Sequence, residues 1–209
     1  MRTVAVLSQK GGSGKTTLAL HLAVAAGLAG RVAAVIDIDP QASAAGWKDA
    51  RGSETPVVVS LPATRLAQAL TAAREAAADI TLIDSAPHSG DVALAAAEVA
   101  DFIIIPCRPG ILDLRAIGAT VRIMKLAGKP GSVVLNAMPP NAPHVAADAR
   151  AAVAVHGLEV APVTIQQRAA FQHALTLGQT AHEYDPEGKA TMEITELYQW
   201  LSGELEKLA

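Results

Sequence analysis

Several features that are common in proteins are scarce in this chain. Its 209 residues include a single cysteine, Cys107, which excludes an internal disulfide and a cysteine-built metal site. Aromatic residues make up only 3%, so the core must consist of many aliphatic contacts rather than a few large rings. Charged residues reach only 18% while hydrophobic residues reach 51%, and this balance excludes global disorder.

Strong net charge and long apolar runs are also missing. A formal charge of −3 argues against a protein that coats nucleic acid along its whole surface, although it leaves room for a local basic patch. No segment approaches the ~20 uninterrupted apolar residues of a membrane span, and Val4–Leu7 is far too short for the core of a signal peptide. We therefore expect a cytoplasmic protein with no membrane partner.

Short aliphatic runs alternate with longer stretches that suit helices. The expected strands are Thr3–Ser8, Val32–Asp37, Val57–Ser60, Ile80–Asp84, Phe102–Pro106, Ser132–Asn136 and Glu159–Val163. The expected helices are Lys15–Leu28, Ala63–Ala78, Asp91–Ala100, Asp113–Ala127, Pro143–His156 and Lys189–Leu208. This alternation predicts an α/β fold in which residues 1–209 form a single doubly wound domain. Its central sheet of about seven strands would be mostly parallel, with helices on both faces.

A glycine-rich segment joins the first expected strand to the first expected helix. It contains Gly11, Gly12, Ser13, Gly14, Lys15, Thr16 and Thr17. Its glycines allow successive backbone N–H groups to converge on phosphate oxygens, and the helix N-terminus adds its positive dipole end. Lys15 would lie against the β- and γ-phosphates of a nucleotide, and the Thr16 hydroxyl would bind Mg²⁺. A turn without a ligand is the alternative, but the Lys–Thr pair at this spacing, between a strand and a helix, favours the nucleotide.

Acidic residues end two further strands. Asp37 and Asp39 follow the second expected strand, and Asp84 ends the fourth. Ligands of open α/β sheets bind beyond the carboxyl ends of the strands, so these acids can converge on the glycine-rich segment. A single aspartate at such a place would more often be a helix cap or a turn residue. Three of them beside a phosphate loop favour a nucleotide–Mg²⁺ site.

These motifs resemble those of a known family. Residues 10–16, KGGSGKT, are similar to the deviant Walker A box of the ParA/MinD class of ATPases, which is marked by a lysine before the double glycine. Residues 37–41, DIDPQ, resemble a segment typical of ParA proteins, and residues 84–87, DSAP, resemble the family's Walker B end. The resemblance runs from residue 1 to about residue 168. It implies a P-loop NTPase that uses ATP and Mg²⁺ and hydrolyses ATP to ADP and phosphate.

The resemblance also assigns roles to individual residues. Lys10 would reach the nucleotide of the opposing subunit in an ATP-bound homodimer, and Lys15 would be the ordinary phosphate lysine. Asp39 would orient the attacking water, while Asp37 and Asp84 would hold Mg²⁺ through its water shell. Phosphoryl transfer needs extra positive charge at the departing phosphate, which gives the second lysine a physical reason.

Three more residues are assigned to the base of the nucleotide. Asn136, at the end of its strand, matches the family's adenine-contacting asparagine. Pro162 and Val163, after the last expected strand, would line the base on its other side. A structural role is the alternative for each, because asparagine and proline are frequent at strand ends.

Several branches of the family have to be weighed. One cysteine per subunit cannot supply the bridging iron–sulfur cluster of the nitrogenase iron protein branch. The acidic C-terminal segment differs from the basic membrane helix of MinD proteins. We expect a small ParA-type ATPase that segregates or positions plasmid or chromosomal DNA, or a protein cargo. A metabolic enzyme of the dethiobiotin-synthetase type and a MinD-like positioning ATPase are the alternatives.

The same resemblance implies non-specific DNA and a ParB-like or other adaptor protein as partners, with association to the nucleoid when ATP is bound. One basic set comprises Arg108, Arg115, Arg122, Lys125 and Lys129, with Asp113 the one acid among them. Arg115, Arg122 and Lys129 fall along one helical stripe at a spacing of seven. A second set comprises Arg150, Arg168 and Lys189. A solvated helix face is the alternative for each set.

Overall fold

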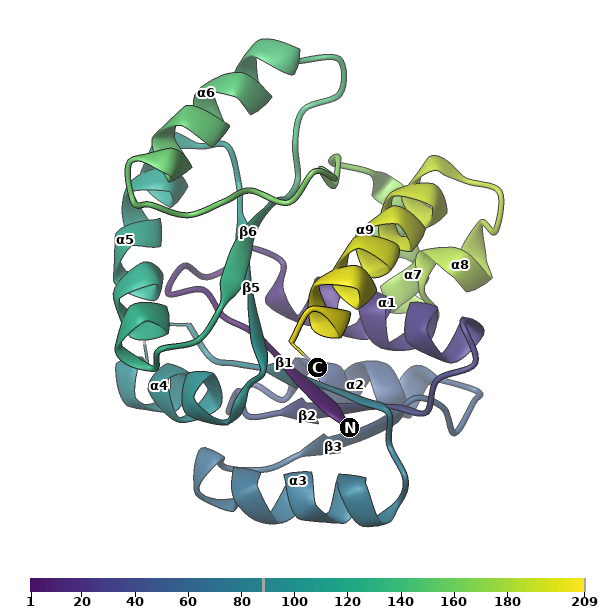
Figure 1. Ribbon diagram of the computed structural model, residues 1–209. Helices are drawn as coiled ribbons and strands as arrows, with labels where there is room; N and C mark the ends of the chain where they lie inside the picture. The colour runs from purple at the N-terminus through teal and green to yellow at the C-terminus, as the bar shows by residue number, and fades with distance from the viewer. Residues whose placement is uncertain (88, 209) are drawn as a thin grey trace.

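The computed structural model describes residues 1–87 and 89–208, and it confirms the α/β class with a parallel sheet between two layers of helices (Figure 1). The strand order is β3-β2-β4-β1-β5-β6, and every neighbouring pair is parallel. The central position of β1 puts the glycine-rich segment that follows it in the middle of the sheet edge. The strands are β1 (Arg2–Val6), β2 (Ala33–Asp37), β3 (Val57–Ser60), β4 (Ile80–Asp84), β5 (Phe102–Cys107) and β6 (Gly131–Leu135).

The sequence predicted a seventh strand at Glu159–Val163, and this prediction is wrong for the described residues. The segment makes only an isolated parallel bridge, between Val160 and Val133. Val133 N–H donates to the Glu159 carbonyl at 3.0 Å, and Ala161 N–H donates to the Val133 carbonyl at 2.8 Å. The next residue that would face β6 is Val163, but the Leu135 carbonyl accepts from the Ile165 N–H at 2.9 Å instead, so the regular ladder ends. The sheet therefore has six strands, with a short stretch of chain lying along β6.

Six of the helices match the expected ones to within a few residues. In the expected helix Ala63–Ala78, a short 3₁₀ turn at Ala63–Arg65 precedes the α-helix. Three short helices, α2, α7 and α8, were not predicted by the sequence. No helix in the described part of the chain is long and apolar enough to cross a membrane. The helices are α1 (Lys15–Leu28), α2 (Ser43–Ala50), α3 (Leu66–Glu75), α4 (Gly90–Val99), α5 (Ile111–Leu126), α6 (Pro143–Ala154), α7 (Ala169–Thr176), α8 (Ala181–Tyr184) and α9 (Lys189–Glu206).

Each face of the sheet carries its own hydrophobic cluster. Helices α1, α2, α7, α8 and α9 cover one face, called the α1 face below, and α3, α4, α5 and α6 cover the other, the α5 face (Figure 1). Side chains alternate between the faces along each strand, so Val4 and Val6 point to the α1 face while Ala5 and Leu7 point to the α5 face. The same alternation places the strand-end residues Asp37, Asp84 and Asn136 on the α1 face, beside the start of α1.

Candidate nucleotide-binding site

The glycine-rich segment turns sharply between β1 and α1. Gly12 has a φ of +69° and Gly14 a φ of +99°, both in the left-handed region that side chains rarely adopt. The Asn136 side-chain amide donates a hydrogen bond from Nδ2 to the Ser13 carbonyl at 2.7 Å. A Cβ atom on Gly14 would collide with that same amide. Asn136 therefore holds the loop in place, and only glycine fits at position 14.

Lys15 and Thr16 form the first turn of α1. The Lys15 side chain is buried, which lowers its pKa, while the nearby carboxylates of Asp84 and Asp39 act in the opposite direction. Thr16 donates a hydrogen bond from Oγ1 to Asp84 Oδ2 at 2.5 Å. The first turn of the helix is thus linked directly to the end of β4, and a buried cation faces two acids.

Asp84 has one oxygen without a partner. The residue is almost fully buried, and burial raises the pKa of its carboxyl to about 7 despite the hydrogen bond from Thr16. Its Oδ1 has no hydrogen-bond partner in the described part of the chain, and the same is true of the buried Ser13 hydroxyl. Carboxylate and hydroxyl oxygens beside a phosphate loop suit Mg²⁺, which usually keeps several of its own waters. A cation with its water shell would satisfy the unpartnered oxygen and favour the ionised carboxylate.

Asp37 is committed to the backbone of the next loop. Its Oδ1 accepts from the Asp39 N–H at 2.9 Å, and its Oδ2 accepts from the Ala44 N–H at 3.0 Å. Burial raises the pKa of this carboxyl, and the two backbone hydrogen bonds oppose the rise. Asp37 therefore fixes the segment that carries Asp39 and caps the start of α2. Its predicted contact with Mg²⁺ through water stays a prediction.

Asp39 and Lys10 lie at the rim of the site. Asp39 is half-buried, and its Oδ1 accepts from the Gln41 N–H at 2.9 Å, which holds the loop in a turn. Lys10 is also half-buried, and its N–H donates to Ser8 Oγ at 3.3 Å. The Lys10 side chain borders a small cavity of about 10 Å³ with Ser13 and Asp113. No hydrogen bond or ion pair of the Lys10 ammonium is formed with the described residues.

A polar cleft of about 350 Å³ opens beside the loop, on the side of Asn136. Pro162 and Val163, predicted to line the base, are not among its lining residues: the Pro162 carbonyl accepts from Arg150, and Val163 packs against the core. The same segment reaches the cleft further on, at Gln166–Arg168. The described residues that line the cleft are Gly14, Thr17, Arg108, Pro109, Gly110, Asp113, Asn136, Ala137, Gln166, Gln167, Arg168, Phe171 and Gln172.

Four of the residues that line the cleft carry no motif in the sequence: Gln166, Gln167, Phe171 and Gln172. The one signal for them was that they follow the aliphatic segment Glu159–Val163. That segment was expected to be a strand, so the residues at its end were predicted to line the base instead. Arg108, assigned to a basic DNA patch, instead has its guanidinium close to Gly12. The base-side wall of the cleft thus comes from irregular chain and from α7.

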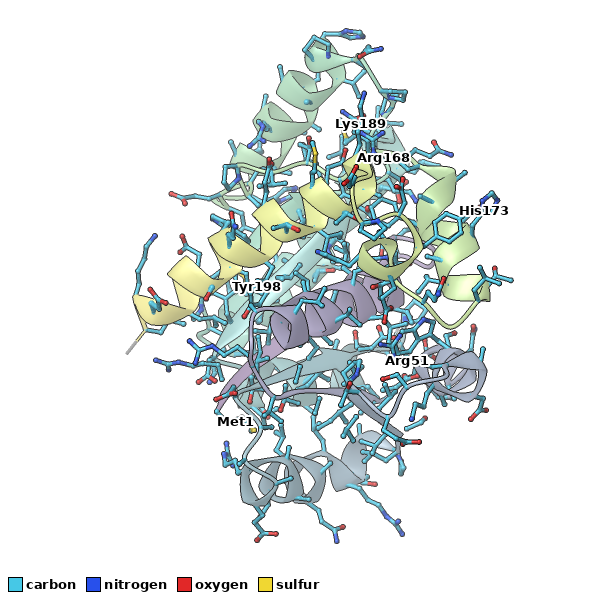
Figure 2. All side chains as sticks on the ribbon, turned by 90° about the vertical axis from the view of Figure 1, so that its right-hand side faces the viewer. Met1, Arg51, Arg168, His173, Lys189 and Tyr198 are labelled. Atoms are coloured by element: carbon cyan, nitrogen blue, oxygen red, sulfur yellow. The ribbon has the colours of Figure 1, made fainter. Side chains whose placement is uncertain are left out.

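The two predicted basic sets differ in how free their charges are. Arg168 makes an ion pair with Glu193 at 2.6 Å, close to Lys189 at one end of α9 (Figure 2). Arg150 donates to the backbone carbonyls of Val160 and Pro162. On α5, Arg115 and Arg122 are exposed, and no ion pair involves them among the described residues. The α5 set therefore has more charge available for a polyanion.

A parallel sheet whose central strand leads through a glycine-rich turn into a helix, with Lys, Thr and Asp at its mouth, defines a P-loop NTPase. Residues 4–181 match the family described as "CbiA: CobQ/CobB/MinD/ParA nucleotide binding domain", so the chain belongs to this family. The resemblance inferred from the sequence motifs is confirmed. Members of the family are ATPases, and the donor set described above fits ATP with Mg²⁺ as the cofactor pair.

Individual relatives support the same placement. The chain is 31% identical over 209 residues to "Maintenance of carboxysome distribution protein A" of Gloeobacter kilaueensis, covering 99% of this chain and 94% of that protein. It is 29% identical over 154 residues to "Chromosome-partitioning ATPase Soj" of Thermus thermophilus, covering 60% and 62% of the two chains. Among solved structures, the cell division ATPase MinD of Pyrococcus furiosus superimposes with a TM-score of 0.74 at 24% identity, covering 100% and 99%.

Proposed function

We propose that this chain is a ParA-type positioning ATPase, in which ATP binding drives dimerisation and DNA binding and hydrolysis reverses both. The observation that carries the proposal is the convergence of Lys15, Asp39 and Asp84 on one phosphate loop, with a second lysine, Lys10, at its rim. The relative that matches the whole chain is named for distributing carboxysomes, which favours a protein assembly as cargo. Segregation of DNA is the second candidate, supported by the match to the chromosome-partitioning relative.

The proposed chemistry distributes three tasks over the chain's own residues. The glycine-rich loop and Lys15 bind the phosphates. Thr16 and Asp84 hold Mg²⁺, with Asp37 acting through a water, and the ion when bound neutralises charge on the phosphates. Asp39 orients the attacking water. Each of these groups except Asp39 is held by the buried contacts around the loop.

Lys10 carries the proposed coupling between hydrolysis and dimerisation. Its backbone N–H donates to Ser8, whereas its ammonium has no partner among the described residues and can supply charge to the phosphates of a second copy. ATP should then favour a two-fold dimer and ADP should favour monomers. Hydrolysis would depend on both copies.

The proposed DNA contact uses Arg115 and Arg122 of α5. Lys129, predicted on the same helical stripe, lies beyond the end of α5 at Leu126 and after Gly128 with its positive φ, so the spacing of seven does not extend to it. One stripe alone carries few charges, but a dimer presents two, which raises avidity without any new contact. Binding to DNA phosphates releases counterions, so the affinity should fall steeply with added salt. DNA retention should therefore follow the ATP-bound dimer.

The test measures mass by light scattering and DNA retention at two salt concentrations, with ATP and with ADP. Lys10→Ala should keep ATP binding but lose ATP-dependent DNA retention and the ATPase stimulation by DNA and adaptor. Lys48→Ala is the matched control, because Lys48 pairs with exposed Glu54 away from the loop. Asp39→Ala should bind ATP without turning it over. A monomer in both nucleotide states with unchanged DNA binding would contradict the proposal, and ATPase activity that answers only to a small substrate would favour a metabolic enzyme.

A further inference from the structure

The outer edge of β3 is open. Strand β3 pairs only with β2, in parallel register. The Leu61 N–H donates to the Asp37 carbonyl at 3.0 Å, and alternate residues of a parallel strand face the same neighbour. The backbone groups of Val58 and Ser60 therefore point away from the sheet, and no described residue pairs with them. An edge of this kind is a template for another strand.

A groove of about 570 Å³ lies along β3 on the α5 face. Helix α3 packs over β2 and leaves β3 uncovered on this side, at the margin of the sheet (Figure 1). Val57 and Val59 of β3 are 53% and 39% exposed in this groove. The opposite wall is formed by small side chains of α3, namely Ala69, Ala72, Ala73 and Ala76.

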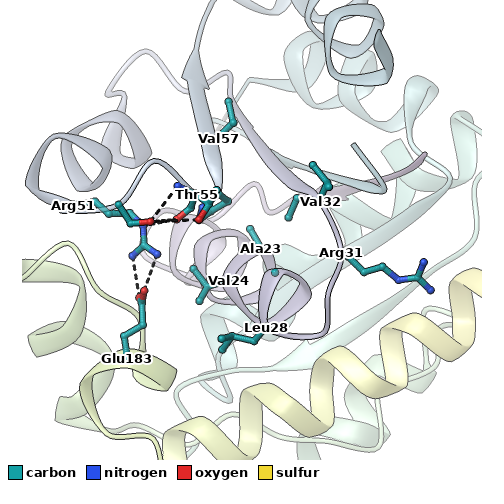
Figure 3. Close-up of a pocket in the computed structure, with 13 residues that line it drawn as sticks. Ala23, Val24, Leu28, Arg31, Val32, Arg51, Thr55, Val57 and Glu183 are labelled. Carbon is teal, nitrogen blue, oxygen red and sulfur yellow. Dashed lines mark hydrogen bonds and ion pairs between the residues drawn. The ribbon is translucent and has the colours of Figure 1, made fainter. Parts of the chain in front are cut away.

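A second groove, of about 390 Å³, lies on the α1 face of the same edge (Figure 3). Val32, Ala33 and Val57 line both grooves, so the two meet at the start of β3. Apolar side chains of α1, among them Val24 and Leu28, form much of the wall. The unpaired edge is thus bordered by an apolar hollow along β3 on the α5 face, where alternate side chains of an added strand would lie. The second groove reaches β3 only at Val57, because α2 packs against the strand on the α1 face.

The charge at the rim of the first groove is positive. Arg65 is the one charged residue among the described lining residues of this groove. In the second groove Arg51 and Glu183 form an ion pair at 2.7 Å, and the Arg31 side chain points away from the groove (Figure 3). A second copy of this chain would bring the same positive charge against Arg65, whereas an acidic segment would complement it.

We propose that β3 takes up an extended segment of a partner protein, rich in alternating apolar residues and carrying acidic side chains. The segment would pair with the backbone of Val58 and Ser60 and place its apolar side chains in the groove along β3. This surface lies outside the nucleotide site, so the inference goes beyond the proposed function and does not depend on ATP.

The test titrates the protein into a fluorescein-labelled peptide in which valine alternates with glutamate and threonine, followed by anisotropy. A peptide with lysine in place of glutamate should bind at least about fivefold more weakly. Arg65→Glu should weaken binding of the acidic peptide by about five- to tenfold and improve binding of the lysine peptide. Arg74→Glu is the matched control, since Arg74 lies on the same helix but does not line the groove, and it should leave binding unchanged.

Hydrogen exchange locates the contact. The acidic peptide should slow exchange at the Val58 and Ser60 amides and leave the glycine-rich loop unchanged. The proposal is overturned if no binding occurs up to about 1 mM peptide, or if Arg65→Glu and Arg74→Glu behave alike. It is also overturned if the two amides become protected without peptide as the protein concentration rises, because a second copy would then be the occupant.

Discussion

The hydrophobic clusters on the two faces of the sheet differ in the kinds of side chain that form them. On the α5 face the cluster is aliphatic, and α4 contributes to it with alanines such as Ala93, Ala96 and Ala97. The α1 face holds all the phenylalanine and tryptophan of the chain: Trp47, Phe102, Phe171 and Trp200. All four rings therefore pack on the α1 face: Phe171 lines the cleft beside the glycine-rich loop, and Phe102 packs against Trp200 at the other end of the sheet.

The difference in composition follows from the lengths of the helices that pack on each face. The α5-face helices alternate with strands, so regular aliphatic contacts suffice. Helices α7 and α8, on the α1 face, span only eight and four residues, too short to be stable alone. They are attached through specific polar contacts, such as the hydrogen bond at 2.9 Å from Trp47 Nε1 to the Gln179 carbonyl. Aromatic packing and specific hydrogen bonds thus hold these short helices on the α1 face.

The largest effect should come from Gly14→Ala, at the loop where the α1 face meets the nucleotide. The substitution forces a side chain into the left-handed region, which costs about 1–2 kcal/mol, and drives it into the Asn136 amide. We expect loss of ATP binding, measured by titration with Mg²⁺ present. Gly46→Ala, in an exposed turn of α2 with open space around it, should bind ATP normally. Unchanged ATP affinity in Gly14→Ala would mean that the loop does not need this conformation.

Arg51→Ala tests whether polar ties hold the short helices. The Arg51 side chain is 5% exposed, pairs with Glu183 and donates to the Gly178 carbonyl at 2.9 Å. Burial alone would raise the pKa of Glu183, but hydrogen bonds and the charge of Arg51 outweigh it and lower that pKa. Removal leaves these groups unpaired, so we expect a loss of about 3 kcal/mol in urea unfolding.

The matched control for Arg51→Ala is Arg74→Ala, in which an exposed arginine of α3 on the other face is removed. It should change the free energy of unfolding by less than about 0.5 kcal/mol. Equal losses in the two variants would show that the two faces are held alike.

Glu193→Gln should have a smaller effect that reaches the cleft. Glu193 accepts from Arg168 and, through Oε2, from the Gln166 N–H at 3.1 Å, so it fixes the segment lining the cleft. We expect a loss of about 1–2 kcal/mol in unfolding together with weaker ATP binding. Glu204→Gln, which breaks an exposed pair with Lys207, should cost less than about 0.5 kcal/mol and leave ATP binding unchanged. The comparison fails if both variants lose ATP affinity equally.

His21 should have its effect only on acidification. Its ring is fully buried against Phe171, at 5.1 Å between centroids, and its Nδ1–H donates to the Thr17 carbonyl at 2.8 Å. Burial lowers the pKa to about 4 from an ordinary value of 6.5. The unfolded chain therefore takes up a proton near pH 6.5 that the folded chain refuses until about pH 4. The contribution of His21 to stability thus falls across this window and is unaffected above it, while the raised pKa of Asp84 contributes in the opposite direction.

Melting temperatures across this pH range check the prediction. His21→Leu should flatten the acid-side decline, whereas His144→Leu, on exposed α6, should decline as the native chain does. If His21→Leu loses stability on acidification as steeply as the native chain, the buried ring is not the cause.

The local patterns of the sequence were sufficient for much of the fold and for the phosphate end of the site. Alternation of strands and helices depends on short-range periodicity, and the glycine-rich turn with Lys15 and Thr16 depends on conformations that few other residues adopt. The period of two along a strand also implies that Asp84 and Asn136 share the face of α1. The resemblance to the ParA/MinD class rested on these same residues.

Only the tertiary structure decided the base side of the site. The predicted strand at Glu159–Val163 has suitable residues, but strand formation requires a continuous ladder with β6, and the Leu135 carbonyl accepts from Ile165 rather than from Val163. The chain therefore reaches the cleft at Gln166–Arg168, held by Glu193 from a helix about 25 residues further on. Contacts between distant segments have no periodic signature in the sequence, which is why the aromatic wall and its ion pairs became visible only in the folded chain.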